Sequence, residues 1–489
     1  MFDSIKNKYT LSLIVLMVVG IIVGLFYLQI SAKEMRWPVG FTVIIIYLSL
    51  LSISNNKKKF LLASLIITCM IRTNVNLWMP TPSYYSTGSG TTSTAIELFA
   101  FDPPLILLAL YLLIERKAKK NTSFKISDIA AMLFILFTTL SIVNCEYPFL
   151  AIVRLPVLLR MPLIYYCLSR GVMSKQDVNV VAQVLIFCIM LQSFLAIAQT
   201  YFGTFAWLGS IVERTDQVTT VQVGNLEVGR ATGTIGYTTV FAQYMGMLSP
   251  IALSFFVFSS SNRNQLIALT AYVLSLLALF LSRSRAEFIN LPIVFLLILI
   301  MAVYKRKFIP MNILKISSVL GAMIVIFSIY SETIIGRFIL PDEDSAYSRI
   351  PMNRIAVNVI KSNPVFGVGL HNYTHAMHKY GIDKEIPNME FGVHNTFLYI
   401  AAETGIINLF FILFLWFTTY KRLLYCLKND DTSLWIVAAG LMCGLTALFI
   451  HSNVEEGFHV HQVLSCMLWS YFGLAAALKS MVVSEIKAA

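Results

Sequence analysis

The part of the sequence richest in chemically capable residues lies between residues 363 and 406, where a histidine follows a glycine-containing turn. NPVFGVGLHNY (363–373) is followed further along the chain by GVHNTFLYIAAETGI (392–406). Histidine is the side chain best suited to take a proton near neutral pH. We therefore predict that His394 is a general base, while noting that an isolated histidine is more often structural.

Four polar neighbours of His394 are predicted to contact a substrate. His371 and Asn372 follow the glycines of the first stretch, and Asn395 and Glu403 belong to the second. Consecutive helical residues are turned by about 100°, so Glu403 lies about half a turn from His394 on a straight helix and should not touch it. Glu403 is expected to face a polar cavity or a neighbouring helix.

Three arginines form a second group of candidates. Arg230 lies in GRATGTIGY, whose small residues allow a ligand to come close to the backbone. Arg283 and Arg285 lie in LSRSRAEF, a tight turn between two apolar runs. Guanidinium groups bind diphosphate oxygens with two parallel hydrogen bonds. These arginines are predicted to hold a diphosphate, and the alternative is contact with lipid phosphates.

Two more arginines occur inside an apolar run, at Arg154 and Arg160. An ionised group within a bilayer is costly, and Arg160 is roughly 15 Å deep in a helix with the usual rise per residue. It requires an anionic ligand or a buried carboxylate, and the sequence leaves both open. Asp102, which precedes two prolines, is predicted to cap a helix.

HSNVEEGFHVHQ, near the C-terminus, concentrates imidazoles and carboxylates. Its five groups are His451, Glu455, Glu456, His459 and His461. Their spacing matches no compact zinc motif, so we predict no metal. A plain polar loop is the favoured interpretation, and a donor or acceptor contact is the alternative.

The composition determines which elements position these residues. Of 489 residues, 57% are hydrophobic and 13% charged, with a mean hydropathy of +0.74. A soluble protein has about 25% charged residues. We predict an all-α polytopic membrane protein, one domain over 1–489 without a separate soluble domain. A span needs roughly 20 apolar residues, which gives about fourteen spans: 11–30, 37–54, 60–79, 97–114, 127–144, 149–169, 178–201, 234–258, 265–282, 286–304, 312–331, 394–419, 433–451 and 459–479.

Basic clusters alternate with these spans. They occur in every second loop, for example at Lys57–Lys59, around Arg170 and Lys175, and at Lys305–Lys307. By the positive-inside rule these loops and both termini are cytoplasmic. The net charge of +12 is thus explained by topology rather than by nucleic-acid binding. The candidate residues fall on the opposite, outer face.

The outer face carries three long segments, 80–96, 202–233 and 332–393. The first is rich in Ser, Thr and Gly and is predicted to be a flexible loop. The third is the largest loop, and its stretch 349–361 is predicted to be a short amphipathic helix lying on the membrane. The apolar positions expected on that helix are Ile350, Ile355, Val357 and Ile360.

Four motifs now stand in one order along the chain: RATGT, then SR at a hairpin, then NPxxGxGLxNY, then HNxxLxxxAETGI entering a helix. This order resembles the O-antigen ligase and Wzy-type polysaccharide polymerase superfamily over residues 230–415. The combination of the last two motifs is the most specific part. The earlier helices are similar in hydropathy alone.

The resemblance implies a metal-independent glycosyltransferase at the outer face of the bacterial inner membrane, whose donor is a glycan on undecaprenyl diphosphate. It implies that Arg230 and Arg285 contact the diphosphate and that His394 activates the acceptor hydroxyl. Arg349 precedes the NPxxG motif as a family arginine does. The doubled SRSR leaves open whether Arg283 or Arg285 is the matching residue, and His371 is an alternative base.

We expect a polymerase of lipid-linked repeat units, with no cofactor and with membrane lipids and a chain-length regulator as possible partners. The preference for polymerase rests on the long set of helices ahead of the matched region. The alternative is a ligase that transfers the glycan to lipid A-core, or less often to protein. A flippase of the same lipid is a distant alternative, because the sequence has no internal repeat.

Overall fold

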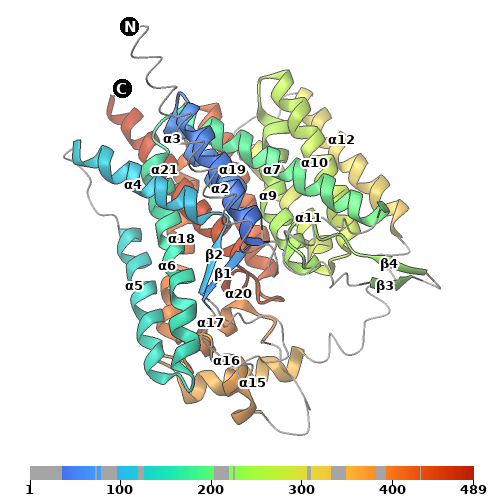
Figure 1. Cartoon of the computed structure of the whole chain (residues 1–489). Coiled ribbons are helices and arrows are strands. Elements are labelled where there is room, and N and C mark those ends of the chain that lie inside the picture. The colour runs from blue at the N-terminus through green and yellow to red at the C-terminus, as the bar shows by residue number, and fades with distance from the viewer. Residues whose placement is uncertain are drawn as a thin grey trace.

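The computed structural model describes residues 36–71, 74–78, 96–118, 126–202, 220–223, 226–304, 310–331, 349–381, 392–429 and 431–488. In these ranges ten helices are long and apolar enough to cross a membrane. They form a helical bundle (Figure 1): α5 (Ile126–Leu140) extended by η2 (Ser141–Asn144), α6 (Pro148–Gly171), α7 (Lys175–Phe202), α9 (Thr238–Phe258), α10 (Asn262–Ser282), α11 (Arg285–Tyr304), α12 (Pro310–Ile329), α18 (Ile406–Leu427), α19 (Thr432–His451) and α21 (Gln462–Ala488). The prediction of a polytopic all-α membrane protein is confirmed.

The predicted number of fourteen spans is not reached in the described residues. The stretch 60–79 is instead helix α3 (Lys57–Cys69) followed by strand β1 (Asn74–Trp78). The stretch 97–114 is strand β2 (Ile96–Phe99) followed by helix α4 (Asp102–Ala118). The two strands pair antiparallel, so neither stretch is one spanning helix. Polar Asn74 and Asn76 alternate with apolar residues in β1, a period typical of a strand.

Two other predicted spans lie at the N-terminus. The span 11–30 lies outside the described residues. The span 37–54 corresponds to helix α2 (Arg36–Ile53), whose described apolar part, Ile44–Ile53, is shorter than a bilayer crossing. The segment 80–96 lies almost wholly outside the described residues.

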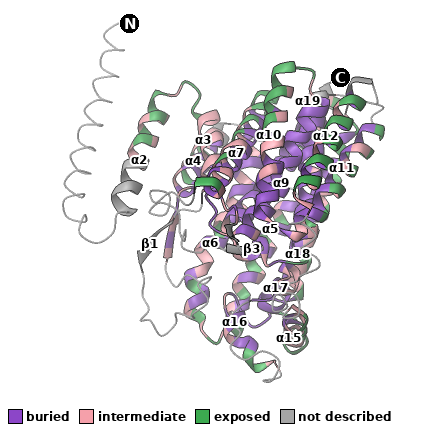
Figure 2. Ribbon diagram, turned by 90° about the vertical axis from the view of Figure 1, so that its right-hand side faces the viewer, coloured by how far each residue is buried: buried purple, intermediate pink, exposed green. Residues whose placement is uncertain are grey.

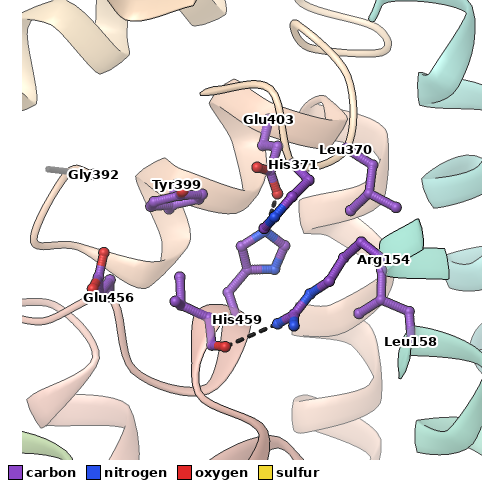
Figure 3. A pocket seen from close by; sticks show the side chains of 10 residues that line it. Arg154, Leu158, Leu370, His371, Gly392, Tyr399, Glu403, Glu456 and His459 are labelled. Carbon is purple, nitrogen blue, oxygen red and sulfur yellow. Dashed lines mark hydrogen bonds and ion pairs between the residues drawn. The ribbon is translucent and has the colours of Figure 1, made fainter. Parts of the chain in front are cut away.

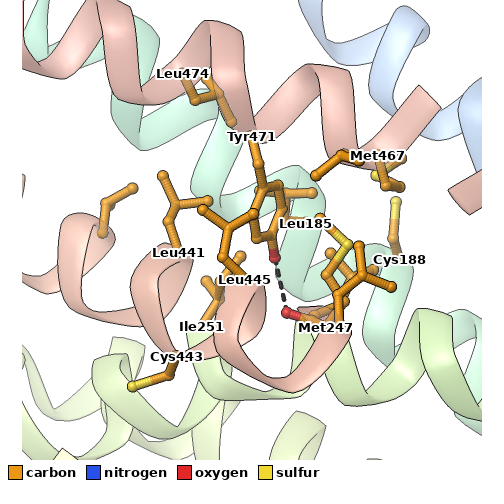
Figure 4. Packing of buried hydrophobic residues seen from close by; sticks show 14 of the residues in the cluster. Leu185, Cys188, Met247, Ile251, Leu441, Cys443, Leu445, Met467, Tyr471 and Leu474 are labelled. Carbon is orange, nitrogen blue, oxygen red and sulfur yellow. Dashed lines mark hydrogen bonds between the residues drawn. The ribbon is translucent and has the colours of Figure 1, made fainter. Parts of the chain in front are cut away.

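Helix α9 is at the centre of the bundle. In its most apolar stretch 94% of the residues are buried, and Figure 2 shows the helix surrounded by the other helices. Small residues allow α19 to approach it: a Cβ on Gly444 would lie 2.0 Å from the carbonyl oxygen of Met247. The Tyr471 hydroxyl of α21 donates a hydrogen bond to the same carbonyl at 2.9 Å (Figure 4). These contacts make the bundle a rigid support for its ends.

Basic loops gather at one end of the bundle. Lys58 pairs with Asp177 at 2.7 Å and Arg170 with Asp128 at 2.9 Å. Lys175 pairs with Asp431 at the start of α19 and with Glu485 near the end of α21. Loops that the positive-inside rule assigns to one side thus meet in space. Which side of the membrane they face remains a prediction.

A layer of short helices covers the other end of the bundle, at the bottom of Figure 1. It consists of α15 (Arg349–Ser362), α16 (Tyr373–Ala376), η3 (Met377–Lys379) and α17 (Thr396–Thr404). The predicted helix at 349–361 is confirmed as α15, and two of its expected apolar residues, Ile355 and Ile360, are partly buried. The buried face is Met352, Ala356 and Val359, whereas Ile350 is 60% exposed.

The predicted span 394–419 is broken at Gly405. Helix α17 ends there and α18 begins at Ile406. Gly405 has a φ of +93°, and a Cβ on it would lie 1.9 Å from the carbonyl oxygen of Val365. Only glycine fits this close contact, which turns α17 away from α18 and leaves its first residues at the covered end.

Candidate functional site

His394 forms a hydrogen-bonded pair with a carboxylate of the last loop. Its Nδ1 lies 3.1 Å from Glu455 Oε2, and the other oxygen, Oε1, accepts a hydrogen bond from Arg349 Nη2 at 3.2 Å. The histidine side chain is 30% exposed and the carboxylate 12%. A carboxylate on Nδ1 fixes the orientation of the ring and leaves Nε2 as the nitrogen that could accept a proton.

The two partners shift each other's pKa. Burial lowers the pKa of His394, but the hydrogen bond to Glu455 and the negative charges of Glu455 and Glu456 outweigh it and raise the pKa. Burial raises the pKa of Glu455, but His394, Arg349 and His451 outweigh it and lower the pKa. Both shifts favour an ionised pair.

Backbone contacts hold His394 in place. Asn395 caps α17, because its Oδ1 accepts hydrogen bonds from the backbone N–H groups of Phe397 and Leu398 at 3.0 Å. The N–H of Thr396 donates to the carbonyls of Ser452 and Glu455, and its hydroxyl also donates to that of Glu455. Asn395 therefore acts as a helix cap next to the histidine, and its predicted substrate contact stays a prediction.

The glycine-containing turn 363–373 packs against the AETG sequence. Val368 and Gly369 donate backbone hydrogen bonds to the carbonyls of Ala402 and Glu403 at 3.0 and 2.8 Å. Gly367, with a φ of +64°, lies so close to this backbone that a Cβ would approach within 2.5 Å. The two motifs are therefore two sides of one contact.

Glu403 forms a buried pair with His459. Glu403 Oε2 lies 2.5 Å from His459 Nε2, and the side chains are 4% and 6% exposed. The expectation that Glu403 turns away from His394 and contacts a cavity or a neighbouring element agrees with this geometry. The pair lies at a small open pocket (Figure 3). The lining residues are Arg154, Leu158, Leu370, His371, Gly392, Tyr399, Glu403, Glu456, His459 and Val460.

The arginines of the two basic motifs meet at the C-terminal end of α10. Arg230 Nε donates to the carbonyl oxygen of Ser282 at 2.9 Å, and the next residue, Ala231, donates its N–H to Leu281. Arg283 ends α10 with a φ of +55°, and Arg285 begins α11. The structure therefore brings the RATGT segment against the SRSR hairpin, as a shared anion site requires.

A second buried pair links this hairpin to the His394 region. Glu287, two residues after Arg285, lies with its Oε1 2.6 Å from His451 Nδ1, and each side chain is 1% exposed. His451 ends α19, and the chain continues directly to Ser452 and Glu455. The SRSR hairpin, which contacts Arg230, is therefore linked to the His394–Glu455 pair through the Glu287–His451 contact and the loop that follows α19.

The remaining predicted residues have structural partners. Arg160 Nε pairs with Asp102 Oδ1 at 2.7 Å, and its Nη2 donates to the carbonyl of Glu97, so the buried-carboxylate alternative holds for it. Asp102 starts α4, but its carboxylate accepts the N–H of Phe99, which precedes the helix, and pairs with Arg160, so the contacts seen are not those of the predicted helix cap. Asn372 is fully buried and bonds the backbone of Tyr147 in both directions. None of these three side chains lines the pocket.

Arg154 and His371 do reach the pocket. Arg154 Nη2 donates to the carbonyl oxygen of Val460 at 2.9 Å, which directs the guanidinium toward the pocket in Figure 3. His371 has a φ of +60°, a conformation rare for residues other than glycine. Such backbone is often found at functional sites.

Sequence reasoning underestimated the loop 451–461. Each of its three histidines lies near a glutamate: His451 with Glu287, His459 with Glu403, and His461 with Glu456 at 3.8 Å. Among the described residues no three such side chains gather as a metal site. The available signal was the density of imidazoles and carboxylates itself, since a plain polar loop has little reason to combine them.

One comparison with known proteins matches part of this region. A family model described as O-antigen ligase matches residues 270–413. The match confirms the family resemblance over that segment, which contains Arg283, Arg285, Arg349 and His394 and excludes the loop 451–461. A search of curated proteins finds no match to the chain.

Proposed function

We propose that this integral membrane protein transfers a glycan from undecaprenyl diphosphate to a sugar hydroxyl, and that it polymerises lipid-linked repeat units of an O-antigen, capsule or exopolysaccharide. The observation that carries the proposal is the His394–Glu455 pair beside Arg349. The pair lies at the same end of the bundle as the arginine hairpin, and His394 and Arg349, but not Glu455, fall in the segment that matches the O-antigen ligase family.

The acceptor side of the reaction needs a base. With Nδ1 directed at Glu455, Nε2 of His394 takes the proton of the acceptor hydroxyl as its oxygen attacks the anomeric carbon. Glu455 stabilises the imidazolium that forms, and Arg349 holds Glu455 from its other oxygen. The new glycosidic bond and the protonated histidine appear in the same step.

The donor side needs positive charge. As the bond between the anomeric carbon and the diphosphate oxygen breaks, negative charge develops on the leaving undecaprenyl diphosphate. Arg230 and the Arg283–Arg285 hairpin are suited to stabilise it with fixed guanidinium groups and no metal. In-line attack inverts the anomeric centre. The polyprenyl tail remains in lipid, so this end of the bundle is proposed to lie at the outer face of the cytoplasmic membrane.

The test is reconstitution of purified protein with the host's own lipid-linked repeat units and no other acceptor. A polymerase converts them into a ladder of products that differ by one repeat. Absence of any glycosidic product, with or without an added acceptor, contradicts the proposal. A chain-length regulator, if added, is expected to narrow the ladder.

A second candidate function is O-antigen ligase, because the matching family model carries that description. A ligase shares the donor and the base but transfers the glycan to lipid A-core. In the same reconstitution it forms no ladder, and it forms a single product series once lipid A-core is added. The reconstitution without and with lipid A-core therefore distinguishes a polymerase from a ligase.

A further inference from the structure

The pocket beside the Glu403–His459 pair is built rather than incidental. Its polar groups are held by hydrogen bonds: Arg154 by the Val460 carbonyl, and Glu403 by His459, with the two members of that pair each more than nine-tenths buried. Tyr399 lies on one side, 6% exposed, and Leu158 and Leu370 on the other (Figure 3). Immobilised polar groups between apolar walls are typical of a ligand site.

The charges of the lining argue against a diphosphate in this pocket. Two carboxylates, Glu403 and Glu456, and two imidazoles, His371 and His459, line the pocket with one guanidinium, that of Arg154. A diphosphate accepts hydrogen bonds and donates few, so two carboxyl groups are poor partners for it, and the imidazole of His459 is already paired with Glu403. Arg230, Arg283 and Arg285 are absent from the lining. The diphosphate and this pocket therefore belong to different parts of the site.

The same groups suit a sugar ring. A hydroxyl both donates and accepts, so it matches a wall that offers carboxylate oxygens on some sides and a guanidinium on another. The carbon-bound face of a pyranose is apolar and packs against an aromatic ring such as that of Tyr399. A carboxyl group that holds a proton can also donate to a hydroxyl, and burial raises the pKa of Glu456 to about 7.

The pocket borders the His394–Glu455 pair. Gly392 and Glu456, which line it, are two residues from His394 and one from Glu455. Gly392 also lies against this wall closely enough that a Cβ would come within 2.9 Å of Glu456 Oε2. A ring bound here therefore has the base at its edge.

We propose that the pocket of Arg154, Tyr399, Glu403, Glu456 and His459 is the acceptor subsite, which binds the sugar ring whose hydroxyl attacks. This inference deepens the proposed function, and the identification of the bound sugar as the acceptor rests on that function. The donor diphosphate is held separately by the arginine hairpin. Glu403 and His459 position the ring from the floor of the pocket, and Glu456 and Arg154 bind its hydroxyls.

The experiment measures two affinities on the full-length protein in nanodiscs. The probes are the oligosaccharide released from the host's lipid-linked repeat unit by mild acid, and inorganic pyrophosphate. Glu456→Gln and Arg154→Lys are expected to weaken oligosaccharide binding about tenfold or more while pyrophosphate binding stays within about twofold. Arg230→Lys is expected to do the reverse.

Lys379→Gln is the matched control, because its ion pair with Glu146 lies on the surface of the same end and is 62% exposed on the lysine side. It should leave both affinities unchanged. The inference is overturned if the oligosaccharide does not bind the wild type, or if Glu456→Gln and Arg154→Lys weaken pyrophosphate and spare the oligosaccharide. A wild type that binds the oligosaccharide through Glu456 and Arg154 but makes no glycosidic product supports the pocket and contradicts the proposed function.

Discussion

The two ends of the bundle carry charge in opposite ways. At the basic end, ion pairs join lysines and arginines to carboxylates across loops, and the outermost is well exposed: Lys175 is 49% exposed and Glu485 38%. At the end covered by α15–α17, imidazole–carboxylate pairs predominate, beside the ion pairs of Arg349 with Glu455 and of Lys379 with Glu146. Three of them are mostly buried, those of His394, His451 and His459.

The difference indicates that the charges at the basic end set the orientation in the membrane, whereas those at the covered end are suited to proton transfer. Lysines and arginines in exposed loops keep their charge at any physiological pH and need only face the right side of the membrane. A buried imidazole–carboxylate pair can exchange a proton near neutral pH, and it costs desolvation that must be offset by good geometry. Substitutions at the two ends should therefore differ sharply in their effect on activity.

The largest effect is expected for His394→Ala. Removal of a general base typically costs about 10²–10⁴-fold in rate, so product from the lipid-linked repeat unit should fall by that factor. The measurement is the initial rate of ladder formation by purified protein. Unchanged yield and monodispersity serve as the control. Full activity in this variant would transfer the base role to His371.

A smaller loss is expected for Arg230→Lys. Lysine keeps the charge but replaces a planar fork with a single ammonium, and it loses the geometry of the bond from Nε to the Ser282 carbonyl. Loss of one charge-assisted hydrogen bond in the transition state corresponds to about a 10- to 100-fold slower reaction. The donor dependence of the rate measures it. A lysine variant with wild-type kinetics would remove Arg230 from the diphosphate site.

A still smaller loss, with a distinct signature, is expected for Glu455→Gln. The amide oxygen can still accept from Nδ1 of His394, but the amide nitrogen then faces Arg349 Nη2. The charge and the hydrogen bond from Arg349 are therefore lost, at a cost of about tenfold in rate. Glu455 raises the pKa of His394, and the base form exists above that pKa. Removal of the charge lowers the pKa, so the acidic limb of the pH–rate profile should move to lower pH. A limb that stays in place would exclude Glu455 as the partner that tunes the base.

The sequence predicts the parts of this architecture that depend on neighbouring residues. Ten spans follow from hydropathy, and α15 follows from its periodicity. The strands β1 and β2 were missed because their apolar content resembled that of helices, although Asn74 and Asn76 mark the alternation of a strand. Gly405 is the local signal for the break that divides the predicted span 394–419.

The site depends on contacts between distant parts of the chain. His394 is recognisable from its motif, but its partner Glu455 is 61 residues away, and Glu287 and His451 are 164 residues apart. The spacing of residues along the sequence does not predict which distant side chains pair. The sequence alone therefore favours a plain polar loop at 451–461. For Arg160, the predicted depth in the membrane indicated that a partner was needed. Only the fold shows that this partner is Asp102.

The smallest effect is expected at the basic end, for Lys175→Gln. This substitution breaks two ion pairs, with Asp431 at 2.5 Å and with Glu485 at 2.9 Å. Exposed pairs contribute little because water and salt screen them. The rate of ladder formation should stay within about twofold of the wild type, because screened, exposed ion pairs contribute so little. The same assay at low and high salt checks the reason, since a loss seen only at low salt still fits screening. A loss as large as that of Glu455→Gln at both salt concentrations would mean that the basic end also takes part in the reaction.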